Sequence, residues 1–165
     1  MPTSWDAYKT ALPSIARAVG RTPLVTLNRV TADVRPAIYL KIEWFGPSGS
    51  LKDRIYLHMF ERAEARGDLR QEMQVLKCST GNAGIACAFV SAMKGYPCTI
   101  VMPEGMSDER KKIVRAYGAT LVCTSGGESD VDLSLAKLEA IRAADPRRYW
   151  VPGQFSKPTT SRRRA

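Results

Sequence analysis

The sequence has few of the residues that build metal sites and disulfide frameworks. Its 165 residues include one histidine and four cysteines, and the cysteines lie far apart in apolar segments as Cys78, Cys87, Cys98 and Cys123. No two of them have the close spacing of a zinc ligand set. We therefore expect no metal, and four small buried thiols in a reducing compartment.

Long apolar runs are absent as well. No stretch approaches the roughly 20 apolar residues that a membrane span requires. Residues 1–9 also lack the charged and then apolar order of a signal peptide. We therefore expect a protein that does not contact membranes and that resides in the cytoplasm.

The charge of the chain is basic, with 25 Lys and Arg against 16 Asp and Glu and a net charge of +9. The basic residues are spread along the chain rather than gathered with aromatic side chains, so we expect no nucleic acid partner and keep nucleic acid binding as the weaker alternative. The hydrophobic fraction of 44% and the charged fraction of 25% are typical of a globular protein, and the length fits one domain.

Short β-rich runs alternate with segments of helical periodicity after residue 50. Apolar residues at 51, 55, 56, 59, 60 and 63 predict a helix over 51–65 that stops at Gly67. Strands are predicted at 74–78, 98–102, 120–123 and 148–151, and two more at 23–27 and 37–42. Further helices are predicted over 83–94, after a cap at Ser107, and along a buried stripe of Val131, Leu135, Leu138 and Ile141.

Strands that alternate with helices of this length predict the α/β class, a three-layer αβα arrangement around a mainly parallel sheet. In such sheets ligands bind beyond the carboxyl ends of the strands, where the strand-to-helix turns converge. Two of these turns carry side chains that suit chemistry.

The first of these turns is a loop of glycines and serines, residues 43–54, that places Lys52 in the first turn of a helix. Burial and the positive helix end disfavour an ammonium there, so the neutral amine that attacks an aldehyde becomes more accessible. A phosphate-binding P-loop needs Gly before the lysine and Ser or Thr after it, but Leu51 and Asp53 stand there. The remaining alternative is an exposed lysine in an ordinary first turn.

The second turn, residues 78–84, follows the 74–78 strand and opens the next helix, so its backbone N–H groups favour an anion. Ser79 and Thr80 add hydroxyls, Gly81 permits close approach, and Asn82 offers a side-chain amide. A tight turn in which Asn82 only tolerates an unusual backbone is the structural alternative.

Several motifs together resemble one family. The resemblance to the cysteine synthase (O-acetylserine sulfhydrylase) and cystathionine beta-synthase family of fold-type II pyridoxal-phosphate (PLP) enzymes runs from about Val19 to Phe155. The motifs, in the family's order, are Gly20-Arg21-Thr22-Pro23-Leu24-Val25, 47–54, 79–86, Val101-Met102-Pro103-Glu104, Tyr117-Gly118-Ala119 and Gln154-Phe155. Ordered motifs are a stronger signal than one short pattern.

The resemblance implies roles for individual residues. Lys52 would bind PLP as a Schiff base and later move protons at the α-carbon of the substrate, while Asn82 would hydrogen-bond the ring hydroxyl of the cofactor. Ser79, Thr80, Gly81 and Gln154 would hold the carboxylate of the amino acid. The reaction implied is β-replacement on an O-acetylserine-like serine derivative by a sulfur nucleophile, and family members are commonly dimers.

The resemblance also implies a domain organisation, the amino-terminal portion of the tryptophan synthase beta-like fold. Residues 1–42 would form an arm that packs on a large domain absent from this sequence, residues 43–152 a small mobile α/β domain, and residues 153–165 a basic tail left by truncation. We expect the 23–27 strand to expose apolar surface.

The sequence departs from the family at two points. Ala83 stands where threonine is usual, and no glycine-rich phosphate loop follows within the 165 residues. Two hypotheses therefore stand side by side: a PLP enzyme impaired by truncation, and a non-catalytic fragment or pseudo-enzyme that binds to or assembles with a homologue.

Overall fold

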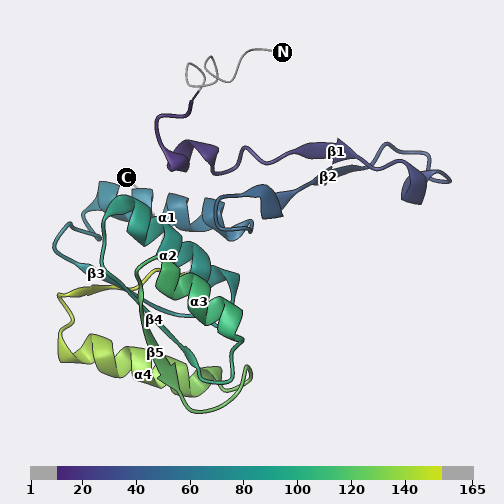
Figure 1. Cartoon of the computed structure of the whole chain (residues 1–165). Helices are drawn as coiled ribbons and strands as arrows, with labels where there is room; N and C mark the ends of the chain where they lie inside the picture. The colour runs from purple at the N-terminus through teal and green to yellow at the C-terminus, as the bar shows by residue number, and fades with distance from the viewer. Residues whose placement is uncertain (1–10, 154–165) are drawn as a thin grey trace, which may run out of the picture.

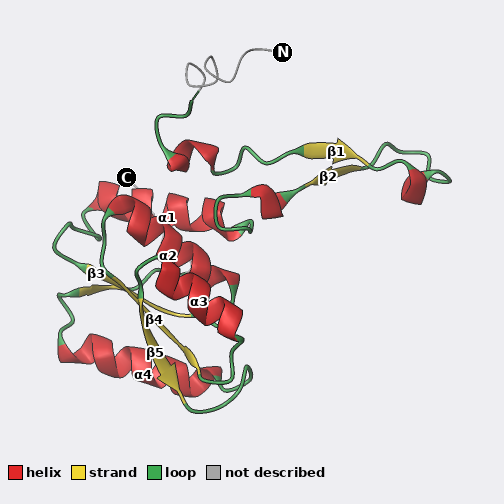
Figure 2. Ribbon diagram, viewed as in Figure 1, coloured by secondary structure: helices red, strands yellow, loops and turns green. Residues whose placement is uncertain are grey.

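The structure, a computed structural model, describes residues 11–153 and contains a parallel four-stranded sheet (Figures 1 and 2). Its strands lie in the order β5-β4-β3-β6. Their bounds are Gln74–Cys78 for β3, Cys98–Pro103 for β4, Thr120–Thr124 for β5 and Tyr149–Trp150 for β6. The six residues of β4 are all buried, as expected for a central strand with both faces covered.

Helices cover both faces of this sheet. Helices α1 (Lys52–Arg66), α2 (Asn82–Lys94) and α3 (Asp108–Ala116) pack on one face, and α4 (Val131–Ala144) packs alone on the other (Figure 1). Alternate strand residues point to the two layers, since Ile100 joins the first cluster and Val101 contacts the cluster of α4. The predicted three-layer α/β architecture is confirmed.

The larger core is built around aromatic side chains. Phe60 of α1 has no exposed surface and meets Trp150 edge-on, with ring centroids 4.8 Å apart, while Tyr96 lies 6.0 Å away on another side. Tyr56 and Phe60 confirm the predicted stripe of α1, but Leu51 does not belong to it, because Leu51 precedes the helix and is 49% exposed.

The buried stripe predicted for α4 is wrong in one position. Leu135 is exposed, and Ser134 is buried in its place, with its hydroxyl 2.6 Å from that of Thr124 on β5. Because this polar pair faces the sheet beside Leu138, the helix is rotated away from the orientation that would bury Leu135. A second difference is that Ser107 occupies the cap position of α3 without a side-chain cap hydrogen bond.

An antiparallel hairpin of β1 (Leu24–Thr26) and β2 (Tyr39–Lys41) precedes this body and projects away from it (Figure 1). Short 3-10 turns flank its strands at Ile15–Ala18, Arg29–Thr31 and Glu43–Phe45. Every residue of both strands is exposed. The predicted exposure of apolar surface is thus confirmed, with Leu24 at 62% and Tyr39 at 60%.

The cysteines are unpaired in the structure. Cys87 and Cys98 are buried as predicted, whereas Cys78 and Cys123 are only half-buried, at the last position of β3 and the fourth position of β5. No helix between residues 11 and 153 combines the length and the apolar content that crossing a membrane requires.

Candidate active site at the carboxyl edge of the sheet

The order of the strands reverses its direction at β3. From β3 the chain moves outward to β4 and β5 with α2 and α3 on one face, and it then returns past α4 on the other face to lie beside β3. The carboxyl edge of a sheet beside such a reversal is where α/β proteins bind ligands. The turn after β3 is the loop of Ser79, Thr80 and Gly81.

The register of the β3–β6 pair brings this loop toward the end of the described chain. Val75 pairs with Trp150, and Lys77 Nζ of β3 donates over 3.3 Å to the carbonyl of Pro152, which follows β6. Gly153 is the last described residue, so the predicted carboxylate ligand Gln154 lies outside the part of the chain that the structure describes.

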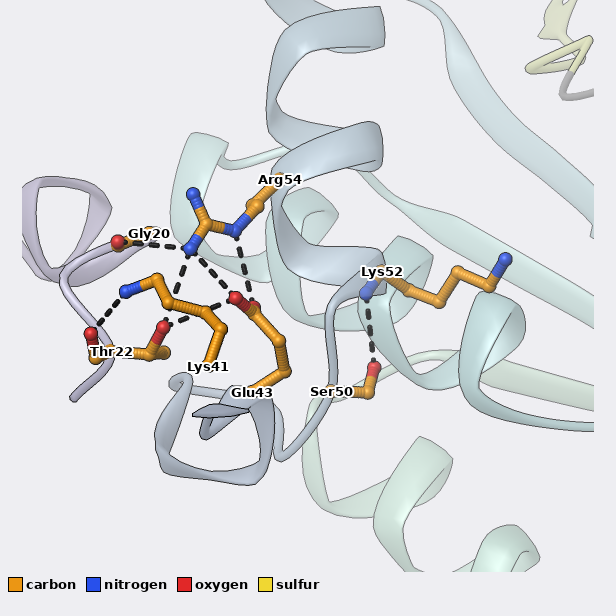
Figure 3. A network of polar contacts seen from close by, with 7 residues as sticks. All are labelled: Gly20, Thr22, Lys41, Glu43, Ser50, Lys52 and Arg54. Carbon is orange, nitrogen blue, oxygen red and sulfur yellow. Dashed lines mark hydrogen bonds and ion pairs between the residues drawn. The ribbon is translucent and has the colours of Figure 1, made fainter. Parts of the chain in front are cut away.

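Lys52 is the first residue of α1, and the preceding loop folds back on the first turn of that helix. The carboxylate of Asp53 is 1% exposed and accepts the Ser48 N–H over 2.9 Å as well as the Ser48 hydroxyl. The Lys52 N–H donates to Ser50 Oγ over 3.3 Å (Figure 3). Two serines of the loop, Ser48 and Ser50, thus form hydrogen bonds with the first turn of α1. A side chain at Gly46 would lie 3.0 Å from Asp53 Oδ2, so this fold-back requires glycine.

The amine of Lys52 is free to react. Within residues 11–153 it forms no hydrogen bond and no ion pair, and in Figure 3 its side chain extends away from the cluster around Arg54. The sequence predicts a buried amine, but Lys52 is half-buried, because it stands at a helix start next to the exposed Leu51. A half-buried primary amine without a partner in this part of the chain is sterically open to a carbonyl compound, which it can attack in its neutral form.

The second loop is organised by Ser79. Its hydroxyl oxygen accepts the N–H of Gly84 over 2.8 Å and that of Gly81 over 3.3 Å, and its own N–H donates to Val101 O on β4. A side chain at Gly84 would meet Ser79 Cβ at 3.1 Å, which explains the glycine there. Ser79 therefore braces the first turn of α2 from two residues before its N-cap residue, Gly81.

The other predicted residues of this loop remain available to a ligand. Thr80 and Gly81 are half-buried, and Asn82 is exposed at the start of α2. A Cβ added to Gly81 would have no atom within 4 Å, so there is open space above its backbone. Thr80 makes no side-chain hydrogen bond within the described residues, in contrast to Ser79.

The structure places the two loops on adjacent helices but does not join them by contact. Lys52 and Asn82 each begin a helix, and α1 packs against α2 in the same core. Across the described chain, no hydrogen bond links Lys52 to Ser79, Thr80, Gly81 or Asn82. The loop of residues 78–84 follows β3 of the parallel sheet as predicted, whereas the loop of Lys52 follows β2 of the hairpin, so the two turns do not extend from one sheet.

Sequence reasoning missed two residues near this edge. Asp53 is a buried carboxylate at the second helical position, a place where acidic residues favour a helix start, so its position was a usable signal. Lys77 interrupts an apolar strand, and burial lowers the pKa of its amine. The lysine inside an otherwise apolar run was the signal in that case.

Comparison with known proteins was consistent with this geometry. A family model described as pyridoxal-phosphate dependent enzyme matches residues 15–163. A cysteine synthase of Staphylococcus aureus is 40% identical over 145 residues, which cover 88% of this chain and 46% of that protein.

Solved structures give the same result. A cysteine synthase from Entamoeba histolytica superposes with a TM-score of 0.82 at 32% identity, over 96% of this chain and 46% of that one. A hydrogen sulfide-producing enzyme from Fusobacterium nucleatum superposes with a TM-score of 0.79 at 36% identity, over 89% of this chain and 47% of that one. The chain spans about half the length of the relatives that it matches.

Proposed function

Because the chain belongs to the pyridoxal-phosphate dependent enzyme family, we propose that Lys52 holds PLP covalently in a site for β-replacement on a serine derivative. The observation that carries this proposal is the half-buried Lys52 amine, which has no partner within residues 11–153 and stands at the start of α1. The similarity to cysteine synthases supports the choice of reaction.

The residues present fit the cofactor. Lys52 supplies the amine, Asn82 is exposed beside the loop after β3 and would hydrogen-bond the ring hydroxyl, and the open space above Gly81 leaves room for a ligand. When bound, PLP supplies an electron sink for charge that develops at the α-carbon of the substrate. Lys52 would move the proton at that carbon, since a neutral amine can accept a proton and the ammonium that results can return it.

The loop after β3 would hold the carboxylate of the amino acid. Its N–H groups lie at the start of α2, where the helix dipole favours an anion. In this proposal Ser79 braces the loop through its bonds to Gly81 and Gly84, while Thr80, Gly81 and Gln154, which lies outside the described residues, provide donors to the carboxylate. Ala83 adds no hydroxyl.

The proposed reaction replaces a group on the β-carbon of an O-acetylserine-like substrate. The leaving group departs with its bonding electrons, and a sulfur nucleophile takes its place to give cysteine or a related amino acid. Closure of residues 43–152, which we propose form a small mobile domain, would exclude water during this exchange. We further propose a cytoplasmic homo-oligomer, in keeping with four unpaired thiols.

Reductive trapping tests the proposal directly. The full chain is incubated with PLP, reduced with borohydride, digested and mapped by mass spectrometry. We expect Lys52 to acquire a pyridoxyl group faster than the exposed Lys112 of α3. In Lys52→Arg this preferred site of labelling should be lost. Labelling of Lys52 no faster than Lys112 would refute the assignment.

A second candidate is a non-catalytic module that assembles with a homologue. The exposed apolar hairpin favours it, since Leu24 and Tyr39 stand open on β1 and β2. Co-purification with a full-length relative, together with no pyridoxyl label on Lys52, would support this reading. A clean monomer in sedimentation at micromolar concentration would count against it.

A further inference from the structure

Arg54 joins the amino-terminal segment, residues 11–42, to α1. Its Nε and Nη2 donate to the two carboxylate oxygens of Glu43 over 3.1 and 2.8 Å. Nη2 also donates to Gly20 O over 3.0 Å and to Thr22 Oγ1 over 3.3 Å (Figure 3). Within the described residues, these bonds to Gly20 and Thr22 are the only ones that link residues 11–42 to the body from α1 onward.

The acceptors of Arg54 are themselves held in place. Thr22 is 7% exposed, and its hydroxyl donates to Glu43 Oε1 over 3.2 Å while its carbonyl accepts from Lys41 Nζ. Gly20 has φ +84°, and a side chain there would come within 2.8 Å of Arg54 Nη1. The guanidinium therefore sits in a fitted socket, which we call the Arg54 socket: Gly20, Thr22, Lys41 and Glu43.

The charges of the socket persist at neutral pH. The hydrogen bond from Arg54 lowers the pKa of Glu43, and the same bond raises the pKa of Arg54. The two-point fork of a guanidinium on a carboxylate fixes direction as well as distance, which an ammonium cannot do.

Arg54 and Lys52 belong to one helical turn. Asp53, between them, is fixed from the loop side by Ser48, and Arg54 is fixed from the socket side. The Lys52 side chain extends away from Arg54 and its partners (Figure 3). In the first turn of α1, the side chains of Asp53 and Arg54 are thus held by hydrogen bonds, while the side chain of Lys52 forms none within the described residues.

We propose that Arg54 is a positioning residue for Lys52: by seating in its socket it fixes the loop of residues 46–51 and the direction in which the Lys52 amine emerges. The role of that amine rests on the proposed function, whereas the effect on the loop is argued from Glu43, which binds Arg54 and also accepts the Gly46 N–H at the start of the loop. The backbone bonds that depend on this order include Gly49 N–H to Gly46 O at 2.9 Å and Gly46 N–H to Glu43 O at 3.1 Å.

Amide hydrogen exchange on the full chain tests the proposal without cofactor. The variants are Arg54→Gln, Arg54→Lys and, as the matched control on the exposed face of α1, Arg62→Gln. In Arg54→Gln we expect exchange of residues 46–53 to accelerate about tenfold, with the Val75 amide of β3 unchanged. Arg54→Lys should recover only part of the protection, and Arg62→Gln should match the unchanged chain.

Acetylation measured by mass spectrometry supplies the second readout. The ratio of Lys52 to Lys112 modification should shift by about twofold or more in Arg54→Gln and stay constant in Arg62→Gln. The proposal is overturned if Arg54→Gln changes neither the exchange of residues 46–53 nor the ratio of Lys52 to Lys112 acetylation. Failure of either measurement alone, or complete recovery of protection by Arg54→Lys, would also overturn it. Absence of a pyridoxyl label on Lys52 would instead refute the proposed function alone, so the two failures are distinguishable.

Discussion

Replacing Ser79 by alanine separates the support of the loop after β3 from ligand binding. The change removes an oxygen that accepts from Gly84 N–H at 2.8 Å and Gly81 N–H at 3.3 Å. Gly84 N–H keeps a second acceptor, since it also lies 2.9 Å from Gly81 O, so the Gly81 N–H is the group that loses its one partner among residues 11–153. We therefore expect a loss of about 1 kcal/mol in the free energy of unfolding, within the range for a lost helix cap.

The matched control is Thr80→Ala in the same loop. Thr80 makes no side-chain hydrogen bond within the described residues, so its removal should change the free energy of unfolding by less than about 0.5 kcal/mol. Thr80→Ala should instead weaken the binding of an amino-acid carboxylate. The two neighbouring hydroxyls would thus differ in which property they control.

Urea unfolding followed by tryptophan fluorescence measures this difference. A loss of about 1 kcal/mol corresponds to a midpoint lower by about 0.5 M if the slope is near 2 kcal/mol/M, and the slope should not change. The reasoning is refuted if Ser79→Ala is no less stable than Thr80→Ala.

Two further predictions concern the core and the strand that ends at this loop. Phe60→Ala should lower the free energy of unfolding by about 3–5 kcal/mol, because it empties a fully buried site against Trp150 and Tyr96. Phe60→Leu should lower it by less. The urea midpoints of the two variants measure this difference, and equal midpoints would contradict it. Burial lowers the pKa of Lys77 below its usual 10.5, so in that interval the unfolded chain binds more protons than the folded one. The stability of the unchanged chain should therefore rise relative to Lys77→Met as the pH increases toward 10.5, and a pH-independent difference would exclude this cause.

The sequence predicted best the parts of the fold that depend on the spacing of apolar residues and on glycines at helix ends. Strand β3 begins and ends at the predicted residues, and α1 and α2 end at Gly67 and Gly95, since apolar periodicity and glycine act locally. The burial of Ser134 in place of Leu135 could not be predicted, because it depends on a hydroxyl pair formed with Thr124 across two layers.

The candidate site divides in the same way. The two loops were found because each lies between a strand and a helix, which a linear reading can detect. The bracing by Ser79 and the socket of Arg54 were not found, because one hydroxyl can either hold a ligand or hold its own loop, and the socket unites residues from Gly20 to Arg54. The sequence identifies the hydrogen-bond donors that could bind a ligand. Only the three-dimensional structure shows which of them already bind another part of the chain.

The late return of β6 to the side of β3 has a consequence for synthesis on the ribosome. Strands β3, β4 and β5 can pair in the order in which they emerge, since each lies next to its predecessor. The β3–β6 pair must wait for Tyr149 and Trp150, which pair with the oldest strand of the sheet through only two residues. During translation the nascent domain would therefore form the β3–β4–β5 part of its sheet before β6 joins it.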